Sequence, residues 1–324
     1  MESESSLIFG YSLDGEGGAL KLEEKEISNW DESKGVMWLH LNYSCPSILD
    51  WLSTKFELDD WAIEALTDDE PRSRTLINNK YIFTCLRSVN LSQDDEQEDM
   101  VSIRVYMKGN LIITSRSREL FYLKNICHLL LSSNGPKTSI QLLESIMESI
   151  NDDSSEHINF IVDSIDEIEQ NYLMNSSDIK RDDISNLRRK VLMLKRYLAP
   201  QKEAIRQFTT QQILSFNAND KLSFQQHYDN TARNVEELDL ARERCSLLQE
   251  QMTNKLSEQL NNRMYLFSMI TALFLPISSV ASLFGMNLGG IPGTNSSWGF
   301  ALVCFLLLIN SVGLMIYLRK KQWF

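Results

Sequence analysis

A run of 55 residues without a charged side chain, Met264–Leu318, is the feature that most limits how this chain can fold. A soluble segment of that length would carry about a dozen charges. Residues 264–284 and 298–318 are mostly apolar, and each is long enough for a helix to cross a bilayer. A pair of buried core helices is the competing interpretation. Two such segments in tandem, with no charge between them, favour two transmembrane helices instead.

The basic residues predict an orientation for these spans. Arg263 precedes the first span, three basic residues at 319–321 follow the second, and the connection 285–297 has none. Because loops rich in Lys and Arg stay in the cytoplasm, we expect both termini there and the short connection outside. The sequence therefore predicts a multi-pass membrane protein with a short cytoplasmic tail at 319–324.

The region before the spans is acidic. Residues 1–263 hold all 44 acidic side chains of the chain and 29 of its 32 basic ones. Such a balance argues against nucleic acid as a partner, since phosphate-binding surfaces need clustered Lys and Arg. It suits a domain that gathers cations, although it also fits a surface that merely stays soluble. The five cysteines show neither a disulfide framework nor a zinc finger, which favours a reducing compartment.

Residues 1–135 predict a compact α/β domain, and residues 136–263 predict a helical region that ends in a long stalk. In the first part, alternating apolar runs favour strands, and Lys108-Gly109-Asn110 is a hairpin signal. The expected strands are 7–12, 36–43, 81–86, 102–107 and 111–115, and the expected helices are 47–56 and 59–66.

Helical spacing of apolar residues takes over after residue 138. It predicts helices over 139–171, from about 182 to Pro200, and from about 220 onward. The last helix has neither Gly nor Pro before Pro276. At 1.5 Å per residue, about 60 residues form a helix some 90 Å long, which cannot sit inside a small globule. It is expected to join the acidic domain to the membrane.

One face of this last helix carries polar residues into the membrane. Steps of three and four residues define what we call the polar stripe: Glu250, Asn254, Ser257, Asn261, Met264, Ser268, Thr271, Leu275, Ser278 and Ser282. A dry coiled-coil seam would be Leu and Ile. Hydroxyl groups at membrane depth indicate a face that surrounds water, although such groups also bond to their own helix or join neighbouring helices. One hairpin cannot enclose a pore, so a cyclic homo-oligomer is predicted.

The first span ends in Phe284-Gly285-Met286-Asn287, followed by a glycine-rich connection. In a ring of subunits, Asn287 would present neutral amide oxygens at the outer mouth, which suits a hydrated divalent cation. A plain glycine-rich linker is the alternative. The triplet Gly285-Met286-Asn287, closing the first of two C-terminal spans behind a long helix and an acidic α/β domain, resembles the CorA metal-ion transporter family. The segments 283–293, 196–201 and 38–43 are similar to its zinc-transporting branch.

The resemblance implies a homopentameric funnel in the bilayer, with the first span lining the pore and the Gly285–Asn287 triplet forming the ion entrance. It implies divalent cations as cargo and no prosthetic group. Magnesium-type members carry Tyr before the triplet and an acidic residue after it. This chain has Phe284 and no acid in the connection, which favours Zn²⁺ over Mg²⁺, Co²⁺, Ni²⁺ or Cd²⁺. For the zinc branch, the resemblance implies uptake coupled to protons.

The sequence offers only one candidate for a bound, non-transported metal ion. Asp153 and His157 are one helical turn apart, with Asp152 beside them, and these three are the candidate ligands. A solvated helix face is the plainer interpretation. Two other functions stay open: a magnesium, cobalt or nickel channel of the same architecture, and a membrane-anchored sensor without transport. An enzyme has no support, since no phosphate-binding loop, nucleophile elbow or zinc-protease motif is present.

Overall fold

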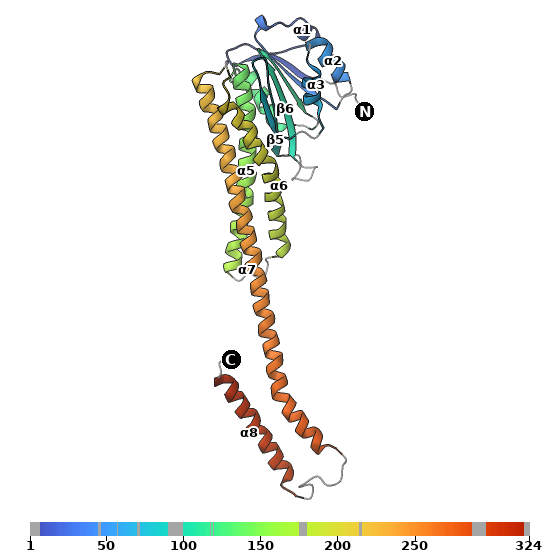
Figure 1. Cartoon of the computed structure of the whole chain (residues 1–324), viewed down its shortest axis with the longest axis vertical. Coiled ribbons are helices and arrows are strands. Elements are labelled where there is room, and N and C mark those ends of the chain that lie inside the picture. Colours follow the sequence, from blue (N-terminus) through green and yellow to red (C-terminus); the bar gives the residue numbers. More distant parts are fainter. Residues whose placement is uncertain are drawn as a thin grey trace. The chain divides into compact units, whose positions relative to one another are not determined.

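The computed structural model describes most of the chain. It leaves out residues 1–6, 45–46, 57, 70–71, 90–99, 117, 119, 175–179, 214–215, 287–295 and 321–324. The described residues form two compact units, Met1–Gln249 and Glu250–Phe324. Figure 1 shows the elements along the chain.

A seven-stranded mixed sheet forms the centre of the first unit, with the order β2-β1-β3-β7-β6-β5-β4. All neighbours are antiparallel except β3 and β7, which run parallel from Met37↔Leu111 to Asn42↔Arg116. The strands are β1 Leu7–Leu13, β2 Ala19–Lys21, β3 Val36–Asn42, β4 Arg74–Ile77, β5 Ile82–Val89, β6 Met100–Lys108 and β7 Leu111–Arg116. All five strands expected from the sequence are confirmed, and the short edge strands β2 and β4 were missed.

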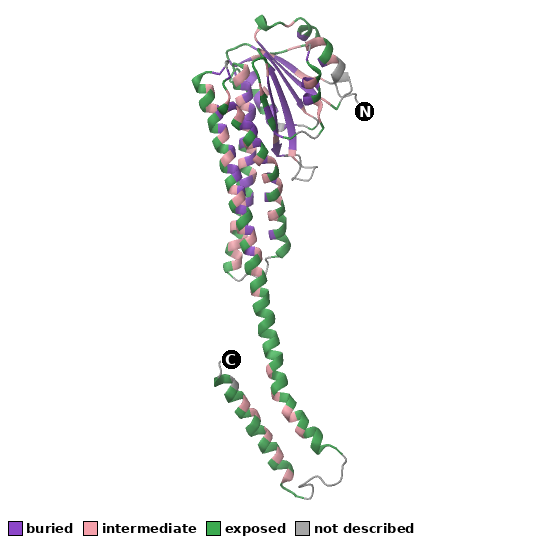
Figure 2. Ribbon diagram, in the orientation of Figure 1, coloured by how far each residue is buried: buried purple, intermediate pink, exposed green. Residues whose placement is uncertain are grey.

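Helices cover both faces of this sheet, because all seven residues of the central strand β3 are buried and need partners on either side. One face packs against α2 (Ser47–Phe56) and α3 (Asp60–Thr67). The other packs against α4 (Phe121–Leu131) and α5 (Ser139–Leu173). Buried residues fill the sheet in Figure 2. The hairpin predicted at Lys108-Gly109-Asn110 is present, and its loop is one residue shorter, since Lys108 already pairs with Leu111 and Gly109 has a φ of 58°.

Two further short elements escaped the sequence pattern: α1 (Glu24–Ser28) and the 3₁₀ turn η1 (Glu32–Lys34). So did α4, whose apolar residues fill the sheet face beneath α5. The elements α1 and η1 are only five and three residues long, too short to show a helical period.

The long helices follow the predicted pattern with one correction. Helix α6 runs Arg181–Thr210 and contains Pro200, whereas the sequence predicted its end there. Proline removes one backbone hydrogen bond, to the carbonyl of Arg196. The turns beyond it are held by tertiary packing, because Ala204, Ile205 and Phe208 are buried. Helix propensity, from which the end of the helix was predicted, does not include this packing energy.

Helix α7 is continuous over Ala218–Phe284, and α8 covers Gly299–Lys320. In the first unit, α7 packs with α5 and α6 through residues at helical spacing from Phe224 to Leu248. Polar groups also join α7 to α5: Thr231 Oγ1 donates to Asn151 Oδ1 at 2.8 Å, and Asn234 Nδ2 donates to Ser155 Oγ at 3.1 Å. Near the end of this unit, Arg244 pairs with Glu169 at 2.6 Å and with Asp166 of α5.

Candidate functional site

Two helices are long and apolar enough to cross a membrane, Ala218–Phe284 and Gly299–Tyr317, and their apolar stretches, which lie in the second unit, are not buried. Large side chains such as Phe267 and Phe300 are 68% and 83% exposed. Apolar surface on this scale is unfavourable in water, by about 25 cal/mol per Å². The chain is therefore an integral membrane protein.

The membrane part of α7 has two distinct faces. Partly covered residues recur on one of them: Met269, Leu273, Pro276, Ile277 and Val280. On α8 the partly covered residues also share one face: Gly299, Val303, Leu307, Ser311 and Leu314. At 100° per residue, the membrane residues of the polar stripe centre about 165° away from the covered face of α7. The polar stripe is thus the side of the span that is most open to a neighbour or to water.

Each predicted member of the polar stripe from Glu250 to Ser282 lies within the described helix, and each is exposed. Near mid-span, the Thr271 hydroxyl donates to the carbonyl of Phe267 at 2.9 Å. This bond satisfies the hydroxyl hydrogen and leaves the oxygen lone pairs as acceptors on the open face. Such a surface can accept hydrogen bonds from the water shell of a cation.

The end of the span is only partly described. Helix α7 ends at Phe284, and the amide of Gly285 donates to the carbonyl of Ala281 at 2.9 Å. Met286 follows, 43% exposed. The third residue of the predicted entrance, Asn287, lies outside the described residues, so its role stays a prediction.

The predicted metal trio is not assembled in the single chain. Asp153 Oδ2 accepts from the buried Ser88 hydroxyl at 3.2 Å, and burial raises the pKa of Asp153. The ring Nδ1 of His157 lies 2.8 Å from the backbone carbonyl of Asp153, and Asp152 is exposed. Among the described residues no group of three His, Cys, Asp or Glu side chains could hold a metal ion. Because α5 packs against β5, the Asp153 side chain points toward the sheet, where it bonds to Ser88.

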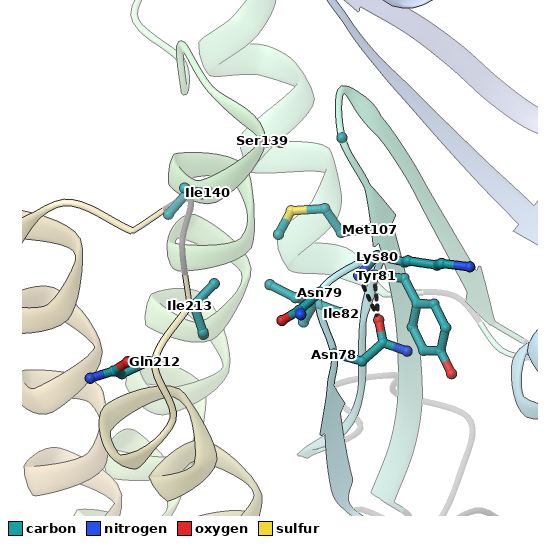
Figure 3. A pocket seen from close by; sticks show the side chains of 11 residues that line it. Asn78, Asn79, Lys80, Tyr81, Ile82, Met107, Ser139, Ile140, Gln212 and Ile213 are labelled. Atoms are coloured by element: carbon teal, nitrogen blue, oxygen red, sulfur yellow. Dashed lines mark hydrogen bonds between the residues drawn. The ribbon is translucent and has the colours of Figure 1, made fainter.

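Two cavities in the first unit were not anticipated. One, of about 240 Å³, lies beside the β4–β5 turn, where Asn78 Oδ1 accepts from the amides of Lys80 and Tyr81 at 2.8 Å each (Figure 3). The turn satisfies its own polar groups, so we assign it no ligand. The other is lined by four arginines. No local signal could have revealed it, because Arg72, Arg87, Arg118 and Arg196 come from four separate segments.

The mixed sheet, the continuous helix α7 and an open polar stripe between apolar surfaces define an integral membrane protein of the transporter class. A family model described as "CorA-like Mg2+ transporter protein" matches residues 33–320. The chain therefore belongs to the CorA-like family.

Several relatives match over nearly the whole length. The chain is 34% identical to the divalent cation transporter CmaX of Pseudomonas aeruginosa, over 99% of this chain and 97% of that protein. It is 30% identical to the zinc transport protein ZntB of Pectobacterium atrosepticum, over 98% and 96%. The solved full-length CmaX protein has a TM-score of 0.86 at 31% identity and full coverage of both chains. The CorA magnesium transporter of Methanocaldococcus jannaschii shares the fold, with a TM-score of 0.82 at 18% identity, over 98% of this chain and 99% of that one.

Proposed function

We propose that this protein moves divalent metal cations, zinc in particular, across the cell inner membrane through a pore lined by the polar stripe of α7. The carrying observation is the placement of that stripe on the open face of the span, opposite the covered one. A face of hydroxyl and amide groups in an otherwise apolar helix is expected where it meets water.

A pore of this kind needs several copies, because one helical hairpin leaves the polar stripe open. A closed ring of identical chains would turn every stripe toward a common axis. We propose a homopentamer, in keeping with the CorA-like family. In that ring the first span forms the inner wall and α8 contacts lipid. The bilayer, divalent cations and further copies of the chain are then its partners.

Neutral oxygen atoms bind a metal cation weakly enough to let it pass through a pore. The Thr271 hydroxyl and its neighbours can exchange hydrogen bonds with the water shell of an ion without removing it. A thiolate or imidazole cage would hold zinc too tightly to release it. The acidic residues before Met264 raise the local cation concentration at one end of the path. No prosthetic group is needed for this task.

The choice of zinc follows from the connection between the spans and from relatives. Residues 285–297 hold no acid, and ZntB proteins match over nearly the full length. Magnesium transport is the second candidate, favoured by the name of the family model. Cobalt, nickel and cadmium are further ions to test. For the orientation, we propose both termini in the cytoplasm, because Arg263 and residues 319–321 flank the spans.

Flux into liposomes tests this proposal. The purified protein is reconstituted around a zinc-sensitive dye, with and without a proton gradient, and a magnesium dye is used in parallel. Thr271→Val keeps the shape of the side chain and removes the hydroxyl. We expect it to slow zinc flux about 5- to 10-fold, since a hydrogen bond contributes about 1 kcal/mol per site. Thr271→Ser should recover most of the flux.

Ser311→Ala is the matched control. The Ser311 hydroxyl also donates to its own helix, to Leu307 at 2.9 Å, but it lies on the partly covered face of α8. Its removal should leave flux within about twofold of the native rate. An equal loss of zinc flux in Thr271→Val and Ser311→Ala would show that the polar stripe does not line the ion pathway. Magnesium flux without zinc flux would favour the second candidate, and flux of neither ion would favour a membrane-anchored sensor. Asn287→Ala tests the predicted entrance in the same assay.

A further inference from the structure

A cavity of about 750 Å³ opens in the first unit between the sheet edge and helix α6. Its walls come from the approach to β4, from β5 and β6, from the segment after β7, and from α6. The lining residues are Asp69, Arg72, Ser73, Arg87, Met100, Val101, Ser102, Arg118, Arg196, Tyr197 and Pro200. The volume is that of a small-molecule site, which typically measures about 300–1,000 Å³.

The cavity exists because neighbouring strands differ in length. Strand β4 begins at Arg74, which pairs with Cys85, whereas β5 continues to Val89. The last residues of β5 therefore have no strand on that side. The buried Gln201 of α6 occupies part of the gap, and its Oε1 accepts from the backbone amide of Arg87 at 2.7 Å. The remaining space is the cavity.

The charge of this cavity is opposite to that of the chain. Among its described lining residues there are four arginines and one carboxylate, that of Asp69, in a protein with a net charge of −12. The Arg87 guanidinium lies 4.5 Å from the ring centroid of Tyr197, and that of Arg196 lies 6.0 Å from it. Stacking of this kind fixes the planar donor groups in place. Converging guanidinium groups are the preferred protein partners of phosphate oxygens.

Two buried polar groups close to the cavity have no hydrogen-bond partner among the described residues. Ser73 is 9% exposed and lines the cavity, and its hydroxyl has no hydrogen-bond partner within the part of the chain that is described. The same holds for Nε2 of the fully buried Gln201, next to the lining residue Pro200. A buried polar group without a partner costs about 1–3 kcal/mol. Both atoms are closed off from the cavity, so a bound anion would meet the arginines and not these two donors.

We propose that this cavity binds a small polyphosphate anion of nucleotide size. Four guanidinium groups exceed what one phosphate can use, and the volume accommodates a chain of phosphates with an attached group. A nucleic acid is a poor fit, since the strongly acidic surroundings repel a long polyanion. The site lies in the first unit, apart from the residues of the polar stripe. The proposal does not depend on which ion the membrane helices carry.

The test is titration calorimetry of the full-length protein in detergent, with ATP, inorganic tripolyphosphate and adenosine as probes and a chelator present. We expect ATP and tripolyphosphate to bind and adenosine not to. Arg72→Gln and Arg196→Gln should each weaken binding about 10-fold. Tripolyphosphate binding equal to that of ATP would assign recognition to the phosphates, and tighter ATP binding would add a contact to the nucleoside.

Arg206→Gln is the matched control, because Arg206 lies on the same helix, does not line the cavity and is 52% exposed beside Glu203. It should bind as the native protein does. Equal weakening by Arg206→Gln and Arg196→Gln would mean adsorption to general positive charge and would overturn the proposal. So would the absence of binding at millimolar ATP, or binding of adenosine alone. Arg72 is exposed, so its variant should melt like the native protein and any loss there reports on binding.

Discussion

Thr231 of helix α7 offers a sharp test of how this helix is fixed to α5. Its hydroxyl is fully buried, donates to Asn151 Oδ1 at 2.8 Å, and lies 2.8 Å from the carbonyl of His227. Thr231→Val keeps the shape but removes the donor. The loss of one neutral hydrogen bond costs about 1 kcal/mol, and the unsatisfied amide oxygen of Asn151 adds about as much. We expect the variant to lose about 2 kcal/mol of stability.

For a unit of this size, each kcal/mol shifts the melting temperature by about 2–4 °C, so the expected decrease is about 4–8 °C. The assay is circular dichroism at about 222 nm on the full-length protein in detergent. Ser246→Ala is the control, because that hydroxyl donates only to the Arg242 carbonyl of its own helix. Asn151→Leu combined with Thr231→Val should recover part of the loss, since both polar groups are then gone. A melting temperature within about 1 °C of native for Thr231→Val would refute the reasoning.

Three further outcomes follow from buried groups of the first unit. Burial lowers the pKa of His40 to about 3 in the folded protein, so the unfolded chain binds more protons between about pH 6.5 and 3. The free energy of unfolding therefore falls as the pH drops through this range. In chemical denaturation, His40→Gln should reduce that slope by about 1.4 kcal/mol per pH unit. Burial raises the pKa of Cys85 and Cys127 to about 11, which lowers the fraction of reactive thiolate at pH 8. Maleimide should therefore label these two cysteines about 100-fold more slowly in the folded protein than after denaturation. Phe224→Ala removes a ring stacked 4.7 Å from Phe208 and should cost about 3–5 kcal/mol, seen as a lower melting temperature.

The sequence determined the membrane part of this protein because its signals are local. A run without charges, the helical spacing of hydroxyl residues and the basic flanks are each read from neighbours along the chain. The two apolar helices and the polar stripe on one open face are present as predicted. The strands with alternating or continuous apolar residues were predicted for the same reason, and so was the hairpin at Gly109.

Tertiary structure decided what depends on residues far apart in the chain. Helix α6 continues past Pro200 because the residues after it pack against the sheet, and the edge strand β4 exists because β5 pairs with it. The Asp153 carboxylate accepts a hydrogen bond from Ser88, because α5 packs against β5. The arginine-lined cavity joins segments that no periodicity connects. Local propensity is worth fractions of a kcal/mol per residue, and long-range burial exceeds it wherever the two compete.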